Sequence, residues 1–190
     1  MKRKLYHLSE IKTGYTIRGA IANYQGTQIG VIQAKEVTKG DFRDLNFINI
    51  DNPADYSLKN GDVLLSIKGS FKATVFHKLS QPTIASSSVA IFRVDNQQIL
   101  PEYLALALNS AMMQREFAKI AIGASIKALS IAELKNLTLT VPDLKTQHFM
   151  VDIDRNINHQ LLSLQHKQQK LQQISAYLTD RIIKGDLSND

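Results

Sequence analysis

The sequence predicts an α+β protein in two parts: a curled or barrel-like, β-rich domain with packed helices over residues 1–142, and a long coiled-coil helix over residues 143–190. Three observations support this prediction. Short β-branched runs separated by turn residues fill the chain up to about Asn96. An apolar helical stripe follows Pro101, and an apolar repeat of seven residues follows Pro142.

Five apolar or β-branched runs predict the strands of the first part: "IGVIQA", "NFINI", "DVLLSI", "ATVF" and "SVAIFRV". Turn residues separate these runs, for example Asp51-Asn52-Pro53 and Asn60-Gly61-Asp62. Strands this short and closely spaced are typical of a curled or barrel-like sheet, which leaves no long edge open.

The stretch "PEYLALALNSAMMQREFAKIA" predicts one helix that begins at Pro101. The apolar stripe on the face expected to pack on the sheet consists of Leu104, Leu108, Ala111 and Met112. A capping box between Ser130 and Glu133 predicts a short second helix. After it, "LTLTV" alternates like a half-buried strand that ends at Pro142.

The segment after Pro142 predicts a helix from about Thr146 to Lys184, roughly 58 Å long at 1.5 Å per residue, with Gly185 as its cap. Its length and strict repeat favour a second helix as the partner of the apolar seam. The alternative is a helix that folds back across the first domain. The residues expected in dimerisation are Met150, Ile153, Ile157, Leu161, Leu164, Leu171, Ile174 and Leu178.

Two seam positions near the middle of this helix, Gln160 and Lys167, are polar. Polar seam residues weaken a coiled coil but select its register and partner. In an antiparallel pair with a two-fold axis near Leu164, these groups would face one another. The sequence leaves the choice between parallel and antiparallel pairing open, since a helix rich in Gln and Lys can also be solvated there.

Charge is distributed unevenly along the 190 residues, whose net charge is +6. Residues 1–142 hold 17 Lys and Arg against 11 Asp and Glu, whereas residues 143–190 hold 6 of each. No acid occurs from Val63 to Val94, although Lys68, Lys72, Lys78 and Arg93 lie there. Charge that serves solubility alone is usually mixed in sign, so this window favours a polyanionic partner.

The residue patterns of common catalytic sites are missing from the sequence. The chain has no Cys, no glycine-rich phosphate loop and no H-E-x-x-H motif, and its five His are scattered. We expect "SSS" at 86–88 to form a strand of small residues and not a nucleophile. Glu133 and Lys135 have the spacing of the E-x-K motif found in nucleases, but the capping box accounts for Glu133. The sequence therefore predicts neither an enzyme nor a metal site.

No apolar run approaches the roughly 20 residues of a membrane helix, and no apolar segment follows the basic start as in a secretory signal. We therefore expect a cytoplasmic protein without a membrane partner.

The chemistry that survives is a DNA-binding surface, in which cations contact phosphates while hydroxyls, amides and arginines read base edges. The candidates lie at turns or at the ends of elements, where side chains reach outward from a rigid frame. For each of them alone, a solvated surface residue is the alternative. The candidate DNA-binding residues are Arg18, Lys35, Lys68, Ser70, Lys72, Lys78, Ser125 and Lys127.

Five segments in order resemble one target-recognition unit of the specificity subunit of type I restriction-modification enzymes. They are "SEIKTGYTIRG", "GDVLLSIKG", "TIASSSVAIFRV", "PEYLALALNS" and "IGASIKALSIAELKNLTLTVP", followed by Gln147 and the long helix. In that family a subunit usually carries two such units, whose helices pair antiparallel. The single unit here therefore resembles a half-subunit, and Met1, close to the first segment, favours a natural start over a fragment.

The resemblance implies a homodimer that catalyses nothing and reads a palindrome with an unread gap in double-stranded DNA. It also implies a methyltransferase partner, which binds S-adenosylmethionine, and through it an endonuclease-translocase; no cofactor is expected on this chain. Two alternatives remain at this point: a free-standing nuclease or methyltransferase fragment, and a DNA-binding regulator without a methyltransferase.

Overall fold

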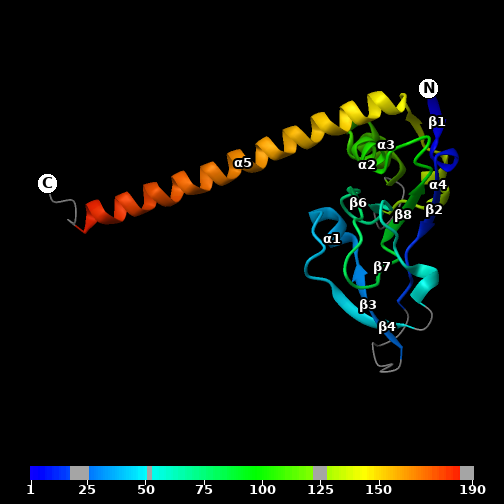
Figure 1. The fold of residues 1–190 in the computed structure, drawn as a ribbon, viewed down its shortest axis with the longest axis horizontal. Coiled ribbons are helices and arrows are strands. Elements are labelled where there is room, and N and C mark those ends of the chain that lie inside the picture. The colour runs from blue at the N-terminus through cyan, green and yellow to red at the C-terminus, as the bar shows by residue number, and fades with distance from the viewer. Residues whose placement is uncertain (18–25, 51–52, 122–127, 185–190) are drawn as a thin grey trace. The chain divides into compact units, whose positions relative to one another are not determined.

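The structure is a computed structural model that describes residues 1–17, 26–50, 53–121 and 128–184. The chain divides into two compact units, Met1–Phe149 and Met150–Asp190. The first unit contains every strand and four short α-helices of the described residues, and the second consists of the continuation of one long helix (Figure 1). The predicted α+β class with a long C-terminal helix is confirmed.

Nine described strands form three open sheets in the first unit. The four-stranded sheet has the order β2 (Ser9–Thr13), β8 (Val89–Val94), β5 (Val63–Ser66), β6 (Ala73–Val75). The three-stranded sheet has the order β4 (Asn46–Ile50), β3 (Thr27–Ile32), β7 (Thr83–Ala85), and β1 (Lys2–Lys4) pairs with β9 (Thr138–Thr140). All five predicted runs form strands, and the curled sheet of the prediction takes the form of these separate small sheets.

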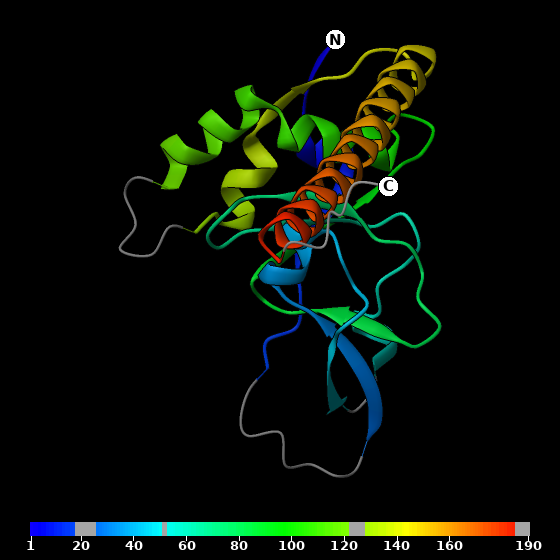
Figure 2. The same ribbon diagram turned by 90° about the vertical axis from the view of Figure 1, so that its left-hand side faces the viewer.

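The four-stranded and three-stranded sheets share part of their core, because Ile32 of β3 and Leu64 of β5 belong to one apolar cluster. Each residue of β5 is buried, and β5 lies between β8 and β6. Leu64 packs in one apolar cluster with Phe76, Ile91 and Val37 of helix α1 (Ala34–Lys39). The three-stranded sheet has a cluster of its own, and Figures 1 and 2 show this sheet at the opposite end of the unit from helices α2 and α3.

The predicted single helix after Pro101 is wrong, because the chain forms two helices, α2 (Pro101–Asn109) and α3 (Ala111–Ala121). Ser110 between them is extended, with φ −61° and ψ 148°, and its hydroxyl accepts a hydrogen bond from the amide of Met113. This break shifts the apolar face, so that Met113 is buried while Met112 is half exposed. The predicted stripe therefore ends at Leu108.

Two local predictions near the helices have different outcomes. The capping box is confirmed at the start of α4 (Ile131–Asn136), where Ser130 and Glu133 exchange hydrogen bonds. The Glu133 carboxylate accepts from the hydroxyl and from the amide of Ser130, and these two bonds lower the pKa of the carboxyl. The predicted strand at 86–88 is wrong: the segment turns between β7 and β8, and the hydroxyls of Ser86 and Ser88 lie 2.7 Å apart.

Helix α5 (Leu144–Ile183) begins two residues before the predicted start, because Asp143 caps it. The Asp143 carboxylate accepts the amide of Thr146 at 2.7 Å, and this bond lowers the carboxyl pKa. Gln147 is fully buried in the first unit and bonds the backbone of Gln98, Leu100 and Pro142. The predicted cap Gly185 lies outside the described residues.

None of the helices formed by the described residues combines the length and apolar character needed to cross a membrane.

Candidate nucleic-acid interface

The turn between β5 and β6, residues 67–72, presents three of the candidate side chains. Lys68, Ser70 and Lys72 are exposed. Gly69 has φ +92°, a conformation that side chains rarely adopt. Phe71 has φ +50° and is buried, with its ring 6.0 Å from that of Phe117. In this turn the Phe71 side chain therefore points into the core, while the neighbouring polar side chains point into the solvent.

Side chains of three elements, β5, α2 and α3, hold this turn and the start of β6 in place. The Ser66 hydroxyl donates to the carbonyl of Lys68 at 2.9 Å. Asn109 of α2 bonds both the amide and the carbonyl of Ala73, at 2.9 and 2.8 Å. Gln114 of α3 donates to the carbonyl of Phe71 at 2.8 Å. Because of the break at Ser110, two successive helices can both donate hydrogen bonds to this part of the hairpin. These bonds make the turn a rigid support for its exposed side chains.

Helix α1 lies beside the turn, because the hydroxyls of Thr38 and Ser70 are 2.6 Å apart. The capping box of Gln33 and Glu36 fixes its start. Lys35 and Lys39, four residues apart, lie on one helical face and are both exposed. We use the name lysine cluster for the exposed lysines of the two segments, which are Lys35, Lys39, Lys68 and Lys72.

Sequence reasoning missed Thr38 and Lys39 as members of this surface. The spacing of four residues from Lys35 was a usable signal for Lys39. Thr38 had no such signal, because its contact with Ser70 spans 32 residues of sequence. The other candidates lie elsewhere. The amide of Lys78 bonds Asn60 at the far end of the β5–β6 hairpin, and Arg18, Ser125 and Lys127 lie outside the described residues.

Nearby acids are already paired, so they oppose the lysine cluster only weakly. Glu36 is buried and accepts from the amide of Gln33, and its carboxylate is 3.3 Å from the Lys35 ammonium. Asp41, just after α1, binds Arg43 side chain to side chain, and this bonding lowers the Asp41 pKa to about 2. Each acid therefore faces a cation, which is Lys35 of the cluster for Glu36 and Arg43 for Asp41.

Arg93 differs from the lysines of the acid-free window. Its guanidinium makes two hydrogen bonds, of 2.7 and 2.9 Å, to the carboxylate of Asp62, which is buried. This partner raises the pKa of Arg93. Asp62 also accepts the amide of Lys59 at 2.8 Å. Arg93 thus belongs to the framework of the sheet, whereas Lys68 and Lys72 form no ion pair with the residues that the structure describes.

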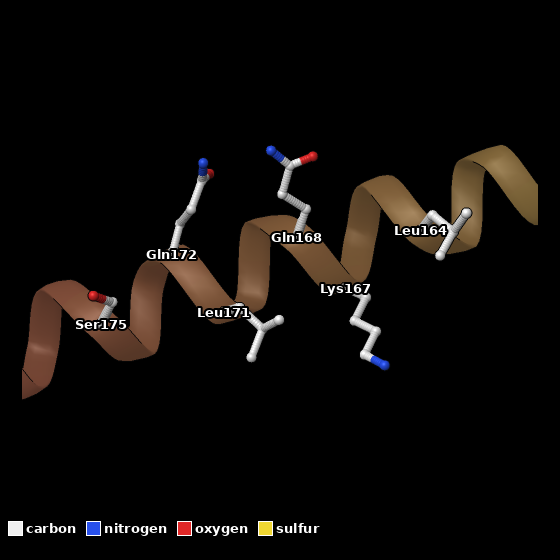
Figure 3. Close-up of a pocket in the computed structure, with 6 residues that line it drawn as sticks. All are labelled: Leu164, Lys167, Gln168, Leu171, Gln172 and Ser175. Atoms are coloured by element: carbon white, nitrogen blue, oxygen red, sulfur yellow. The ribbon is translucent and has the colours of Figure 1, made fainter.

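Helix α5 carries a second candidate surface. The eight apolar residues predicted for dimerisation are all exposed, Leu164 at 62% and Leu171 at 57%. Around them Leu164, Lys167, Gln168, Leu171, Gln172 and Ser175 line a shallow groove. In Figure 3, Gln168 and Gln172 point to one side of it while Lys167 and Leu171 point to the other. Residues spaced i, i+3, i+4 and i+7 form the holes into which a partner helix inserts its side chains.

Titratable side chains do not gather into a metal site: within the described ranges, no group of three His, Cys, Asp or Glu could hold a metal ion.

Comparison with known proteins shows the family to which this chain belongs. Residues 1–176 match the family described as "Type I restriction modification DNA specificity domain". Because this match covers most of the chain, the protein belongs to that family. Its members are the non-catalytic specificity part of restriction-modification complexes, which confirms the prediction that the chain is not an enzyme.

Solved structures with the same fold include the HsdS subunit from Thermoanaerobacter tengcongensis, with a TM-score of 0.70 and 18% identity over 98% of this chain. A structure titled for the assembly and conformational transition of the type I R-M system matches 98% of this chain with a TM-score of 0.73 and 19% identity. The type I S subunit from M. genitalium matches 86% of this chain with a TM-score of 0.58 and 15% identity. No curated protein matches the sequence significantly.

The chain spans less than half the length of these structures: it covers 45%, 46% and 40% of the three matched chains.

Proposed function

We propose that this chain is the DNA-recognition unit of a type I restriction-modification complex, in which two copies pair through α5. The observation that carries the proposal is the lysine cluster around a turn that side chains of β5, α2 and α3 hold in place. Ammonium groups near a duplex neutralise phosphates and release counterions, which supplies affinity. A rigid support holds the polar side chains between them at a fixed distance from the bases.

The charge around the cluster favours a polyanion. Of the four exposed lysines, Lys35 pairs with Glu36, whereas Lys39, Lys68 and Lys72 form no ion pair with the described residues. The nearby Asp41 pairs with Arg43. A surface of one sign attracts DNA over about a Debye length, roughly 8 Å at physiological salt. We include Lys78, Arg18, Ser125 and Lys127 as further candidates in this interface, beyond the cluster itself.

A second copy of the chain is the occupant that fits the α5 seam. The seam residues that recur every seven positions, from Met150 to Leu178, are arranged symmetrically about Leu164. An antiparallel copy therefore meets an apolar side chain at each of these five positions. Gln160 and Lys167 lie on either side of this centre, where they select the register by penalising any slip that places them against Leu or Ile.

Pairing of this kind gives the assembly two-fold symmetry, and two-fold symmetry fixes the form of the target. Each copy reads the same half-site in the opposite direction, so the full target is a palindrome with an unread gap. The partner is a methyltransferase, which supplies S-adenosylmethionine and the chemistry, together with a restriction-translocase subunit. The chain selects the sequence at which those enzymes act.

Selection from random DNA duplexes tests this function. The full-length chain, co-expressed with its methyltransferase partner, should enrich a gapped palindrome from the pool. The chain without the methyltransferase should bind the same half-sites less tightly. An enriched sequence without two-fold symmetry would contradict pairing of two copies, and a failure to enrich any sequence would contradict specific recognition.

Copurification separates this function from that of a stand-alone DNA-binding regulator. A regulator would enrich its target equally well with or without a methyltransferase, and it would not form a stoichiometric complex with one.

A further inference from the structure

Two exposed hydroxyl groups meet within the lysine cluster, and their shared hydrogen bond has a fixed direction. Thr38 Oγ1 lies 2.6 Å from Ser70 Oγ and 2.8 Å from the carbonyl oxygen of Ala34. A carbonyl oxygen only accepts hydrogen bonds, so the single proton of the Thr38 hydroxyl goes to Ala34. The contact between the two hydroxyls must therefore use the proton of Ser70.

This direction makes Ser70 an acceptor towards any ligand. Its only proton is committed to Thr38, while the lone pairs of its exposed oxygen have no other partner among the residues that the structure describes. Phosphate oxygens of DNA also only accept. Ser70 therefore cannot hydrogen-bond a phosphate without breaking its bond to Thr38, and this role falls to the neighbouring lysines.

We propose that Ser70 is a base-reading residue that accepts a hydrogen bond from an exocyclic amino group in the major groove. This inference rests on the proposed DNA recognition. The donors that bases present in that groove are the amino groups of adenine and cytosine, whereas guanine and thymine present acceptors. On the strand that it faces, Ser70 thus selects adenine or cytosine.

The surrounding contacts keep this polarity in place. Ser70 lies in the turn that Gln114 bonds at Phe71, next to Ala73, which Asn109 bonds. Thr38 lies on the short helix whose start is capped by Gln33 and Glu36. Opposite guanine or thymine, two acceptors face each other and lose their water without gaining a bond. We expect discrimination of about tenfold at this position, within the range for a single mismatched base pair.

Three variants of the full-length chain, each complexed with the methyltransferase, test the proposal by selection from random duplexes. Ser70→Ala should lose the preference at one target position and leave the others unchanged. Thr38→Val removes the group that accepts the Ser70 proton, so Ser70 becomes free to donate, and guanine or thymine should be admitted at that same position. Thr38→Ser keeps a hydroxyl with one proton and should select as the wild type does.

A merely structural role predicts a different pattern. A loss of stability would lower the affinity for every target sequence alike and would not change which bases are accepted at one position. Under the proposal, the overall affinity of Thr38→Val for DNA should change by less than about threefold. The proposal is overturned if the wild type enriches a target but neither Ser70→Ala nor Thr38→Val changes any position, or if the affected position holds guanine or thymine in the wild type. In both cases DNA recognition itself stands. If the wild type enriches nothing, DNA recognition falls, and this inference falls with it.

Discussion

Replacing Leu164 and Leu171 together with aspartate should abolish pairing of two copies through α5. Their side chains are 62% and 57% exposed in the single chain. Full burial of a leucine stabilises by roughly 1.5–3 kcal/mol, so covering about 0.6 of each contributes about 0.9–1.8 kcal/mol. Four such side chains meet in a dimer, and their loss removes about 4–7 kcal/mol. This corresponds to a dissociation constant raised by about 10³- to 10⁵-fold, before any cost of the carboxylates.

Light scattering on the full-length chain over a range of concentrations measures this change. The wild type should have the mass of two chains and the double variant the mass of one. Gln165→Asp with Gln169→Asp is the matched control, because both positions face away from the seam and add the same charge. An unchanged mass in the leucine variant, or an equal loss in the control, would refute the assignment of this seam as the pairing surface.

Two further predictions concern the first unit. Charge reversal of Lys68 and Lys72 to Glu should weaken DNA binding. It should also reduce the slope of log K against log salt by about 0.9 for each phosphate that the chain no longer neutralises. Charge reversal at Lys135, outside the lysine cluster, is the control, and an unaltered slope in the Lys68 and Lys72 variant would exclude the turn from the interface. The lowered pKa of Glu133, caused by its bonds to Ser130, means that its contribution to stability is present above the ordinary carboxyl pKa and is lost as the pH falls through the folded value. Glu133→Gln keeps the cap without the charge, so urea unfolding at pH 7 and pH 3 should show a smaller stability difference than in the wild type, and an equal difference would contradict this reading.

Local patterns made several elements predictable. The apolar and β-branched runs in the sequence predicted β3, β4, β5, β6 and β8, and the capping box predicted the start of α4. The seven-residue repeat predicted the long helix, because the repeat can be recognised within one segment of the sequence without knowledge of tertiary contacts. Strands β1 (Lys2–Lys4) and β2 (Ser9–Thr13) were missed because their charged residues are typical of loops. Strand β7 (Thr83–Ala85) was missed as well, since three residues are too few to show a pattern.

The errors have a common cause, which is that a partner distant in sequence overrides the local pattern. The apolar stripe after Pro101 continues through Ser110, but Asn109 bonds Ala73 at the start of β6 and Gln114 bonds Phe71 in the adjacent turn. Because these two residues are five positions apart, a straight helix would not present both to the same segment. Arg93 looks like a free cation in an acid-free window until the fold brings it to the buried carboxylate of Asp62, 31 residues away.

The sequence by itself determined the α+β class, the excess of positive charge in the first part, the apolar seam of the last helix and the lack of known catalytic motifs, because these depend on composition and on spacing along one element. Only the tertiary structure decided which of the lysines share a surface, and that a threonine on α1 sets the direction of the hydrogen bond at Ser70. The physical reason is that a binding surface is made by contacts between segments, and neither the distance nor the proton direction of such a contact is written in the local order of residues.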